Sequence, residues 1–305
     1  MKCAAFRFHG HRAQALAFVF LLVLISRSTA DSGKPSPQDY ASATVGLLKF
    51  VPSGSFQRSD YKDDTTFVTE FRMGEQEVTR DAFAKVMGFD PTSEFESGSK
   101  NVPVQNISWN MAIVFCNKLS LLEGLEPVYS IEGVDFAALT RDGIPEIDDK
   151  AWNWVRVDCS ASGYRLPTEM EWMWAAMGAD TRSPGFVNVD GFRKPFAGSD
   201  GKNNIESYAW FNGKGGFKTH TVKTRKPNEL GIHDLSGNVN EWCWDWESMY
   251  PVGAKVDYKG PEAGFKRVFR GGCFGDHGNF LALGQRFSRE PYRRSGSIGF
   301  RVVRK

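Results

Sequence analysis

One short segment concentrates the oxygen ligands of a possible metal site. Asp234 and Glu241 bracket a turn that contains Gly237, and the backbone carbonyls of such a turn can point inward beside the carboxylates. Carboxylate and carbonyl oxygens are the hard ligands that calcium prefers. The segment therefore predicts a calcium site or, alternatively, a turn in which both carboxylates only cap backbone groups.

Thiols offer a second kind of chemistry. The cysteines that follow Cys3 are Cys116, Cys159, Cys243 and Cys273. They allow three complete disulfide pairings, which the sequence does not rank, and buried free thiols are the alternative. No Cys-x-x-Cys or His-x-x-x-His spacing is present, so we expect no zinc site. Cys273 could act as a lone nucleophile, with only His277 close by in sequence to lower its pKa.

Residues 273–297 have the composition of a recognition surface. They mix aromatic rings, Arg, His, Asn and Asp without helical or strand periodicity, and interfaces favour such residues. Loops on a rigid scaffold commonly carry function. We therefore expect a protein or glycan ligand to contact Phe274, Asp276, His277, Asn279, Phe280, Leu283, Arg286, Phe287, Arg289 and Tyr292. The arginines of this segment suit an acidic or sulfated partner, and a solvated basic loop is the alternative.

The elements that position these segments are short. Residues 47–51 read as a strand, and the alternation over 66–73 predicts its hairpin partner. Helical spacing with a good N-cap predicts helices that begin after Thr79, Ser108 and Thr168. Residues 132–150 are predicted to form a surface loop, and residues 195–305 to form glycine-rich turns and short strands that end with a strand over 298–303. The pattern indicates one small α+β domain.

Composition excludes some partners. The 305 residues include 38 Lys and Arg against 36 Asp and Glu, a formal net charge of +2. That balance provides no electrostatic basis for binding nucleic acid or an anionic membrane surface. The 31 Gly, 24 Phe and 9 Trp favour a loop-rich fold pinned by aromatic rings over a helical bundle. We expect a monomer.

The N-terminus has the layout of a secretory signal. Arg7 and Arg12 precede an apolar run over 15–25, and small residues follow at 28–30. A membrane anchor is the alternative, although a spanning helix needs about twenty apolar residues. We expect a signal peptide over 1–30, a flexible leader over 31–43, a folded domain over 44–305, and export to the periplasm, the cell surface or the medium.

Six segments resemble the motifs of the formylglycine-generating-enzyme (sulfatase-modifying-factor) family, in the same order along the chain. They are Glu77–Thr79, Val102–Trp109, Gly163–Trp172, Gly231–Trp242, Arg270–Gly272 and Ile298–Arg301. The resemblance covers residues 45–305 and implies an α+β, C-type-lectin-like fold that is rich in irregular loops. Within these motifs we expect Trp109, Trp172 and Trp242 to be core anchors.

The same resemblance implies that the family's chemistry is lost. Its enzymes bind copper with two cysteines, whose positions are Asp276 and Leu281 here, and Cys273 stands where serine is usual. Copper(I) needs soft thiolate ligands, so we expect neither copper nor redox catalysis. The family disulfide partner of Cys116 falls at Val302, which excludes that bridge.

The resemblance implies a calcium ion in the first segment described above. Its ligands would be the side chains of Asp234 and Glu241 and the carbonyl oxygens of Gly237 and Val239. A second family calcium site is not expected, because the position of its aspartate falls near Lys214.

Residues 273–297 also resemble the variable region of retroelement-diversified proteins, including those of treponemes, which share this fold. Such regions end just before an Ile-Gly-Phe-Arg motif, as this segment does. Two classes of function follow. The first is an exported, non-catalytic ligand-binding protein, and the alternative is a formylglycine-generating-type oxidoreductase or sulfatase-maturation factor with an altered active site.

Overall fold

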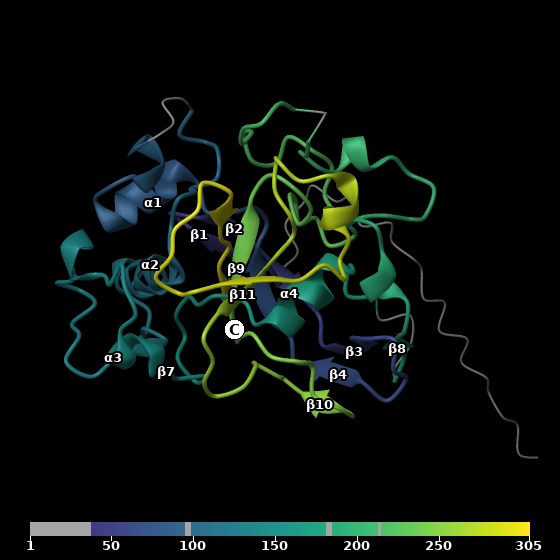
Figure 1. Cartoon of the computed structure of the whole chain (residues 1–305), viewed down its shortest axis with the longest axis horizontal. Coiled ribbons are helices and arrows are strands. Elements are labelled where there is room, and N and C mark those ends of the chain that lie inside the picture. Colours follow the sequence, from purple (N-terminus) through teal and green to yellow (C-terminus); the bar gives the residue numbers. More distant parts are fainter. Residues whose placement is uncertain (1–37, 95–98, 181–184, 213–214) are drawn as a thin grey trace, which may run out of the picture. The chain divides into compact units, whose positions relative to one another are not determined.

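The computed structural model describes residues 38–94, 99–180, 185–212 and 215–305. These ranges form the α+β architecture that the sequence predicts, with short strands, few helices and long irregular connections (Figure 1). The predicted signal peptide lies outside the described residues. The predicted leader is wrong at its end, because Tyr40–Ser42 form strand β1 by pairing with the chain that follows.

The first sheet joins distant parts of the chain. Its strands lie in the order β1, β2 (Gly46–Val51), β5 (Phe71–Gly74) and β14 (Val303–Arg304), and every neighbouring pair is antiparallel. β14 pairs with β5 through Val303 opposite Met73. The C-terminal residues therefore complete a sheet that begins at the first described strand.

The second sheet contains the other half of the predicted hairpin. Its order is β10 (Lys255–Val256), β4 (Thr65–Val68), β3 (Gly54–Gln57) and β8 (Val187–Asn188). The single predicted hairpin is thus two pairs in two sheets, β2 with β5 and β3 with β4. Pro52, which has no N–H to donate to a ladder, stands where the chain leaves one sheet for the other.

The third sheet frames residues 273–297, the segment that is predicted to bind a ligand and is called the recognition segment below. Its order is β12 (Phe287–Arg289), β11 (Arg267–Arg270), β9 (Asn240–Trp246) and β13 (Ile298–Gly299). β11 lies antiparallel to β9 on one side and β13 lies parallel to it on the other. Strand β9 therefore holds both ends of residues 271–297. A fourth, two-stranded sheet pairs β6 (Tyr129–Ser130) with β7 (Arg156–Val157).

The three predicted helices are present, each with its predicted cap. Thr79 caps α1 (Arg80–Met87), Ser108 caps α2 (Trp109–Leu122) and Thr168 caps α4 (Glu169–Ala176) through hydroxyl groups that accept backbone N–H bonds. Helix α3 (Lys150–Asn153) begins at the end of the predicted surface loop. Single 3-10 turns are η1 (Pro91–Glu94), η2 (Arg141–Gly143), η3 (Gly191–Arg193), η4 (Ile205–Ser207) and η5 (Gly278–Leu281).

Tryptophan side chains anchor two core clusters. Trp109 and Trp242 lie in a cluster built around α2, and Trp172 lies in a second cluster around α4. All three side chains are buried, as predicted. Among the described residues, no helix is both long and apolar enough to cross a membrane.

Candidate ligand-binding site

The segment between β11 and β13 leaves the sheet through a tight glycine turn. Gly271 and Gly272 have φ angles of 97° and 71°, which favour glycine. A Cβ atom on Gly272 would lie 3.0 Å from the carbonyl oxygen of Phe280. The turn thus brings the start of the segment against η5, and in Figure 1 the following chain runs across the front of the molecule.

Two of the ten predicted contact residues are held inside the protein. Leu283 is fully buried in the core around α4, and its N–H donates to the Lys194 carbonyl at 3.0 Å. Its prediction as a ligand contact is therefore wrong, because a loop that covers a core must itself contribute apolar anchors. Arg286 is largely buried and its guanidinium is turned inward, where it binds Glu169.

Glu169 is the centre of a buried charge cluster. Its carboxylate accepts bonds from Arg286 at 2.7 and 2.8 Å and from Arg270 Nε at 2.9 Å. Burial raises the pKa of Glu169, but the two guanidinium groups outweigh burial and hold the pKa below its ordinary value. The cluster ties α4 to β11 and to the recognition segment, so it positions the surface that the remaining side chains form.

Those remaining side chains face outward in part or in full. His277, Asn279 and Phe280 are exposed, and Phe274, Asp276, Phe287, Arg289 and Tyr292 are half-buried. The ring of Phe287 stacks on Phe269 with 5.6 Å between centroids, and Phe280 lies 6.3 Å from Phe287. An aromatic and polar surface results.

A second loop adds to this surface, which the sequence did not indicate. The N–H of Asn212 donates to the Asp276 carbonyl at 3.0 Å. Side-chain atoms of Ile205 and Phe211 lie 3.7 Å from the Cβ position of Gly278. The glycine-rich composition around these residues predicted only a loop. It did not indicate which distant segment the loop contacts, because that depends on the tertiary fold.

The positions that correspond to the family's catalytic cysteines carry no thiol, because they are Asp276 and Leu281. Leu281 is buried in apolar surroundings, and Asp276 accepts a hydrogen bond from the Cys273 N–H at 2.9 Å. Burial raises the pKa of the Cys273 thiol to about 12. The cysteines of the described ranges, Cys116, Cys159, Cys243 and Cys273, are all free thiols. The alternative of buried free thiols therefore holds for three of them, and Cys159 is exposed.

The predicted calcium ligands surround a buried, acidic region. Asp234 is buried, its Oδ2 atom accepts the Lys223 N–H at 2.8 Å, and its Oδ1 atom has no partner. Glu241 binds Arg301 at 2.6 and 2.7 Å and also accepts the Trp172 indole N–H. Asp234 therefore has an oxygen available for a cation, whereas Glu241 already has partners for both of its oxygens.

A third carboxylate, Glu77, adds to the negative charge. Glu77 accepts bonds from the Asn238 amide at 2.8 Å and from the Val239 N–H at 3.2 Å, and Gly237 N–H donates to the Gly271 carbonyl. Burial and the neighbouring carboxylates raise the pKa of Glu77, and burial raises the pKa of Asp234 to about 6. No group of three or more His, Cys, Asp and Glu side chains in the described ranges has metal-ligand geometry, so backbone carbonyls would have to complete a calcium site.

Comparison with known sequences supports the predicted family. The profile of the sulfatase-modifying factor enzyme 1-like domain matches residues 35–305. The chaperone protein LppX of Paenibacillus barcinonensis is 35% identical over 220 residues, which cover 66% of this chain and 72% of that protein. The formylglycine-generating enzyme of Streptomyces coelicolor is 34% identical over 170 residues, half of each chain.

Solved structures show the same fold. Treponema denticola variable protein 1 has 34% sequence identity and a TM-score of 0.78, with 88% of this chain and 99% of that chain covered. The structure of CarF has 27% identity and a TM-score of 0.61, with 84% and 97% covered. Each of these two neighbours aligns over nearly its whole length, so the fold extends over most of this chain.

Proposed function

The chain belongs to the family of the sulfatase-modifying factor enzyme 1-like domain, and from this premise we propose that it is a non-catalytic, ligand-binding protein. The observation that carries the proposal is the chemistry at the two former cysteine positions. Asp276 is engaged with the backbone of Cys273 and Leu281 is part of the core. Neither residue offers the soft thiolate that copper(I) needs, and burial raises the pKa of the nearest thiol, Cys273, to about 12.

The proposed binding surface is the outward-facing part of residues 274–294, with the 205–212 loop beside it. Phe280 is 40% exposed and stands among exposed polar side chains. Large aromatic side chains beside polar ones supply most of the binding energy in protein interfaces. Similarity to a protein described as variable and to one described as a chaperone is consistent with recognition of a protein ligand, and a glycan is the other class that such a surface suits.

We further propose that the protein is exported as a monomer and holds one structural calcium ion. Export is inferred from the composition of residues 1–30. Calcium is inferred from the partnerless Asp234 Oδ1 atom in a region where burial and the neighbouring carboxylates, Glu241 among them, raise the pKa values of Glu77 and Asp234. A cation there would neutralise excess negative charge and add stability without taking part in ligand chemistry.

Peptide selection would test the binding proposal even though the ligand is unidentified. A phage-displayed library would be selected on the wild-type protein and on a His277→Ala, Asn279→Ala, Phe280→Ala triple variant. Sequences enriched on the wild type should be lost on the triple variant and kept on a Tyr61→Ala control, whose side chain is 76% exposed in the connection between β3 and β4. Equal enrichment on the triple variant would place binding outside this surface.

An activity assay separates the proposal from the enzyme alternative. A peptide that carries a sulfatase-type cysteine motif would be incubated with the protein, copper and oxygen, and analysed by mass spectrometry beside an active formylglycine-generating enzyme. We expect no formylglycine above the blank. Copper-dependent product that disappears in a Cys273→Ser variant would show that the chain is an oxidase.

A further inference from the structure

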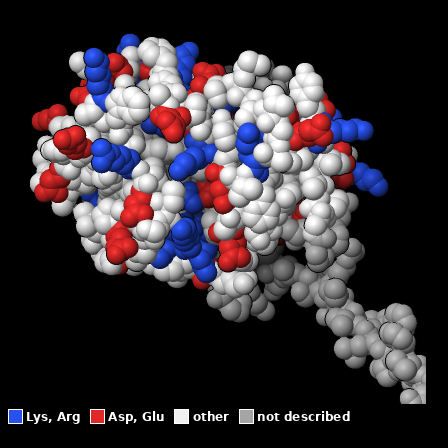
Figure 2. Space-filling model, turned by 90° about the horizontal axis from the view of Figure 1, so that it is seen from below, with Lys and Arg blue, Asp and Glu red and all other residues white. Residues whose placement is uncertain are grey.

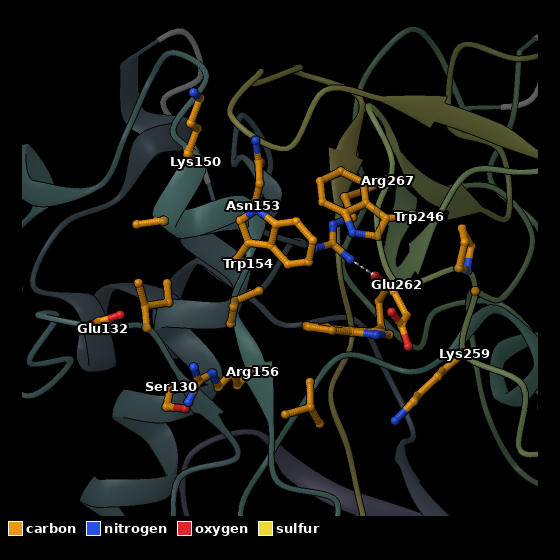
Figure 3. A pocket seen from close by; sticks show the side chains of 17 residues that line it. Ser130, Glu132, Lys150, Asn153, Trp154, Arg156, Trp246, Lys259, Glu262 and Arg267 are labelled. Atoms are coloured by element: carbon orange, nitrogen blue, oxygen red, sulfur yellow. Dashed lines mark hydrogen bonds between the residues drawn. The ribbon is translucent and has the colours of Figure 1, made fainter.

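A large cavity opens on a different part of the protein from the recognition segment. It has a volume of about 1120 Å³ and is lined by residues of β6, α3, β7, β9, β11 and the 259–262 loop (Figure 3). No lining residue comes from 271–297. Pockets for single small molecules usually occupy about 300–1,000 Å³, so this cavity can hold a ligand of more than one ring.

The cavity contains a buried cation without an acidic partner. Arg267 is 1% exposed, and its guanidinium lies between the ring faces of Trp109 and Trp246, at 3.8 and 3.4 Å from their centroids. It donates one bond, from Nη1 to the Trp244 carbonyl at 2.6 Å, and its buried Nε has no partner. No carboxylate forms an ion pair with Arg267 among the described residues.

This arrangement leaves the Arg267 guanidinium without an ion-pair partner in the described part of the chain. Burial lowers the pKa of Arg267 well below its ordinary value, although Asp245 opposes the effect from a distance. The Asp245 carboxylate accepts the Glu169 N–H through Oδ2 at 2.7 Å, and its Oδ1 atom has no hydrogen-bond partner. Aromatic faces stabilise a guanidinium but do not neutralise it, so a negatively charged ligand group in the cavity would supply the missing partner.

Trp154 provides an aromatic platform at the same cavity. Its side chain is 66% exposed, which is unusual for a residue that buries large apolar area when it can. In Figure 3 the indole of Trp154 points toward Arg267 and Trp246. A flat ring face beside a cation suits a ligand that has both an apolar ring face and an anionic group.

Charged and polar side chains surround this platform. The cationic lining residues are Lys150, Arg156, Lys259 and Arg267, against Glu132 and Glu262. Figure 2 shows Lys and Arg gathered in a central band, flanked by Asp and Glu, on the face that carries α3, β7 and β10. Donors and acceptors in this mixture can bind hydroxyl groups, while the excess positive charge favours an anion.

We propose that this cavity binds an acidic saccharide, with a sugar ring stacked on Trp154 and a carboxylate or sulfate directed to Arg267 and Lys259. The C–H face of a sugar supplies the apolar surface, and its hydroxyls match the polar lining. A second cavity of about 350 Å³ shares Val157, Trp244 and Lys259 with the first, so the site can extend beyond one disaccharide. This site is independent of the loop surface proposed above.

Titration with defined saccharides tests this site, with tryptophan fluorescence and calorimetry as readouts. The probes are digalacturonate, a heparin-derived sulfated disaccharide, neutral cellobiose and benzoate. We expect an acidic disaccharide to bind at least about tenfold more tightly than cellobiose and benzoate, because only it has both the ring face and the anion. Equal binding of benzoate would overturn the saccharide assignment, and no binding by either acidic disaccharide would overturn the site.

Exposed positions make the site testable without disturbing the core. Trp154→Ala should weaken binding of the acidic disaccharide by about tenfold, and Lys259→Ala should weaken the acidic probes while leaving cellobiose unchanged. Phe217→Ala, at a side chain 74% exposed away from the cavity, should have no effect. Full affinity in Trp154→Ala, with an unchanged circular dichroism spectrum, would contradict the proposal. The His277, Asn279, Phe280 triple variant should bind the saccharide normally.

Discussion

Cys273 and Cys159 differ in access to solvent, and that difference predicts their reactivity. Cys273 is buried and its pKa is raised to about 12, whereas Cys159 is exposed. The thiolate is the reactive form of cysteine. In a Cys3→Ser background, a native-state titration with Ellman's reagent should modify Cys159 rapidly and the other cysteines only after unfolding.

Two variants complete that test. Cys159→Ser should abolish the rapid phase, and Cys273→Ser should leave it unchanged. A rapid phase that is lost in Cys273→Ser would mean that this thiol is accessible and activated, contrary to its position in the structure.

Asp234 predicts how stability responds to calcium. A ligand bound only by the folded state at 100 times its Kd adds about 2.7 kcal/mol, which corresponds to a rise in Tm of roughly 5 °C or more. Calcium should produce this rise in the wild type and in an Asp63→Asn control, and Asp234→Asn should abolish it. If a chelator leaves the wild-type Tm unchanged, the segment binds no calcium and is only a turn with capping carboxylates.

The raised pKa of Asp234 also predicts how stabilisation by calcium changes with pH. Its folded-state pKa of about 6 lies above the unfolded value of about 3.9, so the folded state binds more protons between these values. Without metal, this group makes the free energy of unfolding fall as pH rises from about 4 to above 6. Calcium needs the ionised carboxylate, and its stabilisation should therefore be larger at pH 7.5 than at pH 5 in thermal melts.

At the scale of elements, Glu169 joins α4 to β11 and to the recognition segment through Arg270 and Arg286. Glu169→Gln would leave two guanidinium groups without their carboxylate, and breaking a buried ion pair in this way costs about 3–5 kcal/mol. Urea unfolding should show that loss. A loss below about 1 kcal/mol would mean that the arginines find other partners.

The same cluster predicts a component of acid unfolding. The folded pKa of Glu169 is depressed, so its contribution is fully present above the unfolded value of about 4.3 and is lost as pH falls through the folded value. Glu169→Gln should lack this component when stability is measured from neutral to acid pH. An identical acid profile in wild type and variant would contradict the assignment.

The elements also show which parts of the fold were accessible from sequence. Helices that begin after Thr79, Ser108 and Thr168 were predicted because a cap and an apolar stripe are local signals. Strand pairing was predicted only for β2 with β5, since the second partner of β5 is β14, far along the chain. The predicted strand over 298–303 is two short strands, because β13 pairs with β9 in one sheet and β14 pairs with β5 in another.

At the scale of the whole molecule, the recognition segment should tolerate change at its surface and not at its anchors. The His277→Ala, Asn279→Ala, Phe280→Ala variant removes only exposed side chains. Its free energy of unfolding in urea should therefore lie within about 1 kcal/mol of the wild-type value. Leu283→Ala, in the same segment but fully buried, should cost about 2–5 kcal/mol. Equal losses in both variants would show that the segment is core throughout.

Composition predicts which segment forms the proposed binding surface but not which of its side chains are exposed and which are buried. Composition identified residues 273–297, yet Leu283 and Arg286 have the same types as residues at an interface and are held inward by Lys194 and Glu169. No motif or spacing in the sequence predicted the proposed saccharide cavity. Trp154 and Arg267 are brought together by contacts among distant strands, which no spacing in the chain expresses.

The position of β9 between β11 and β13 has a consequence for loop-closure entropy. Because one strand holds both ends of residues 271–297, those ends stay fixed whatever the length of chain between them. Closure entropy grows only with the logarithm of loop length, so ten residues inserted near the exposed Arg293 would cost only about 0.3 kcal/mol. The scaffold can therefore accept differences in the length of this segment, and not only in its residues, at little expense in stability.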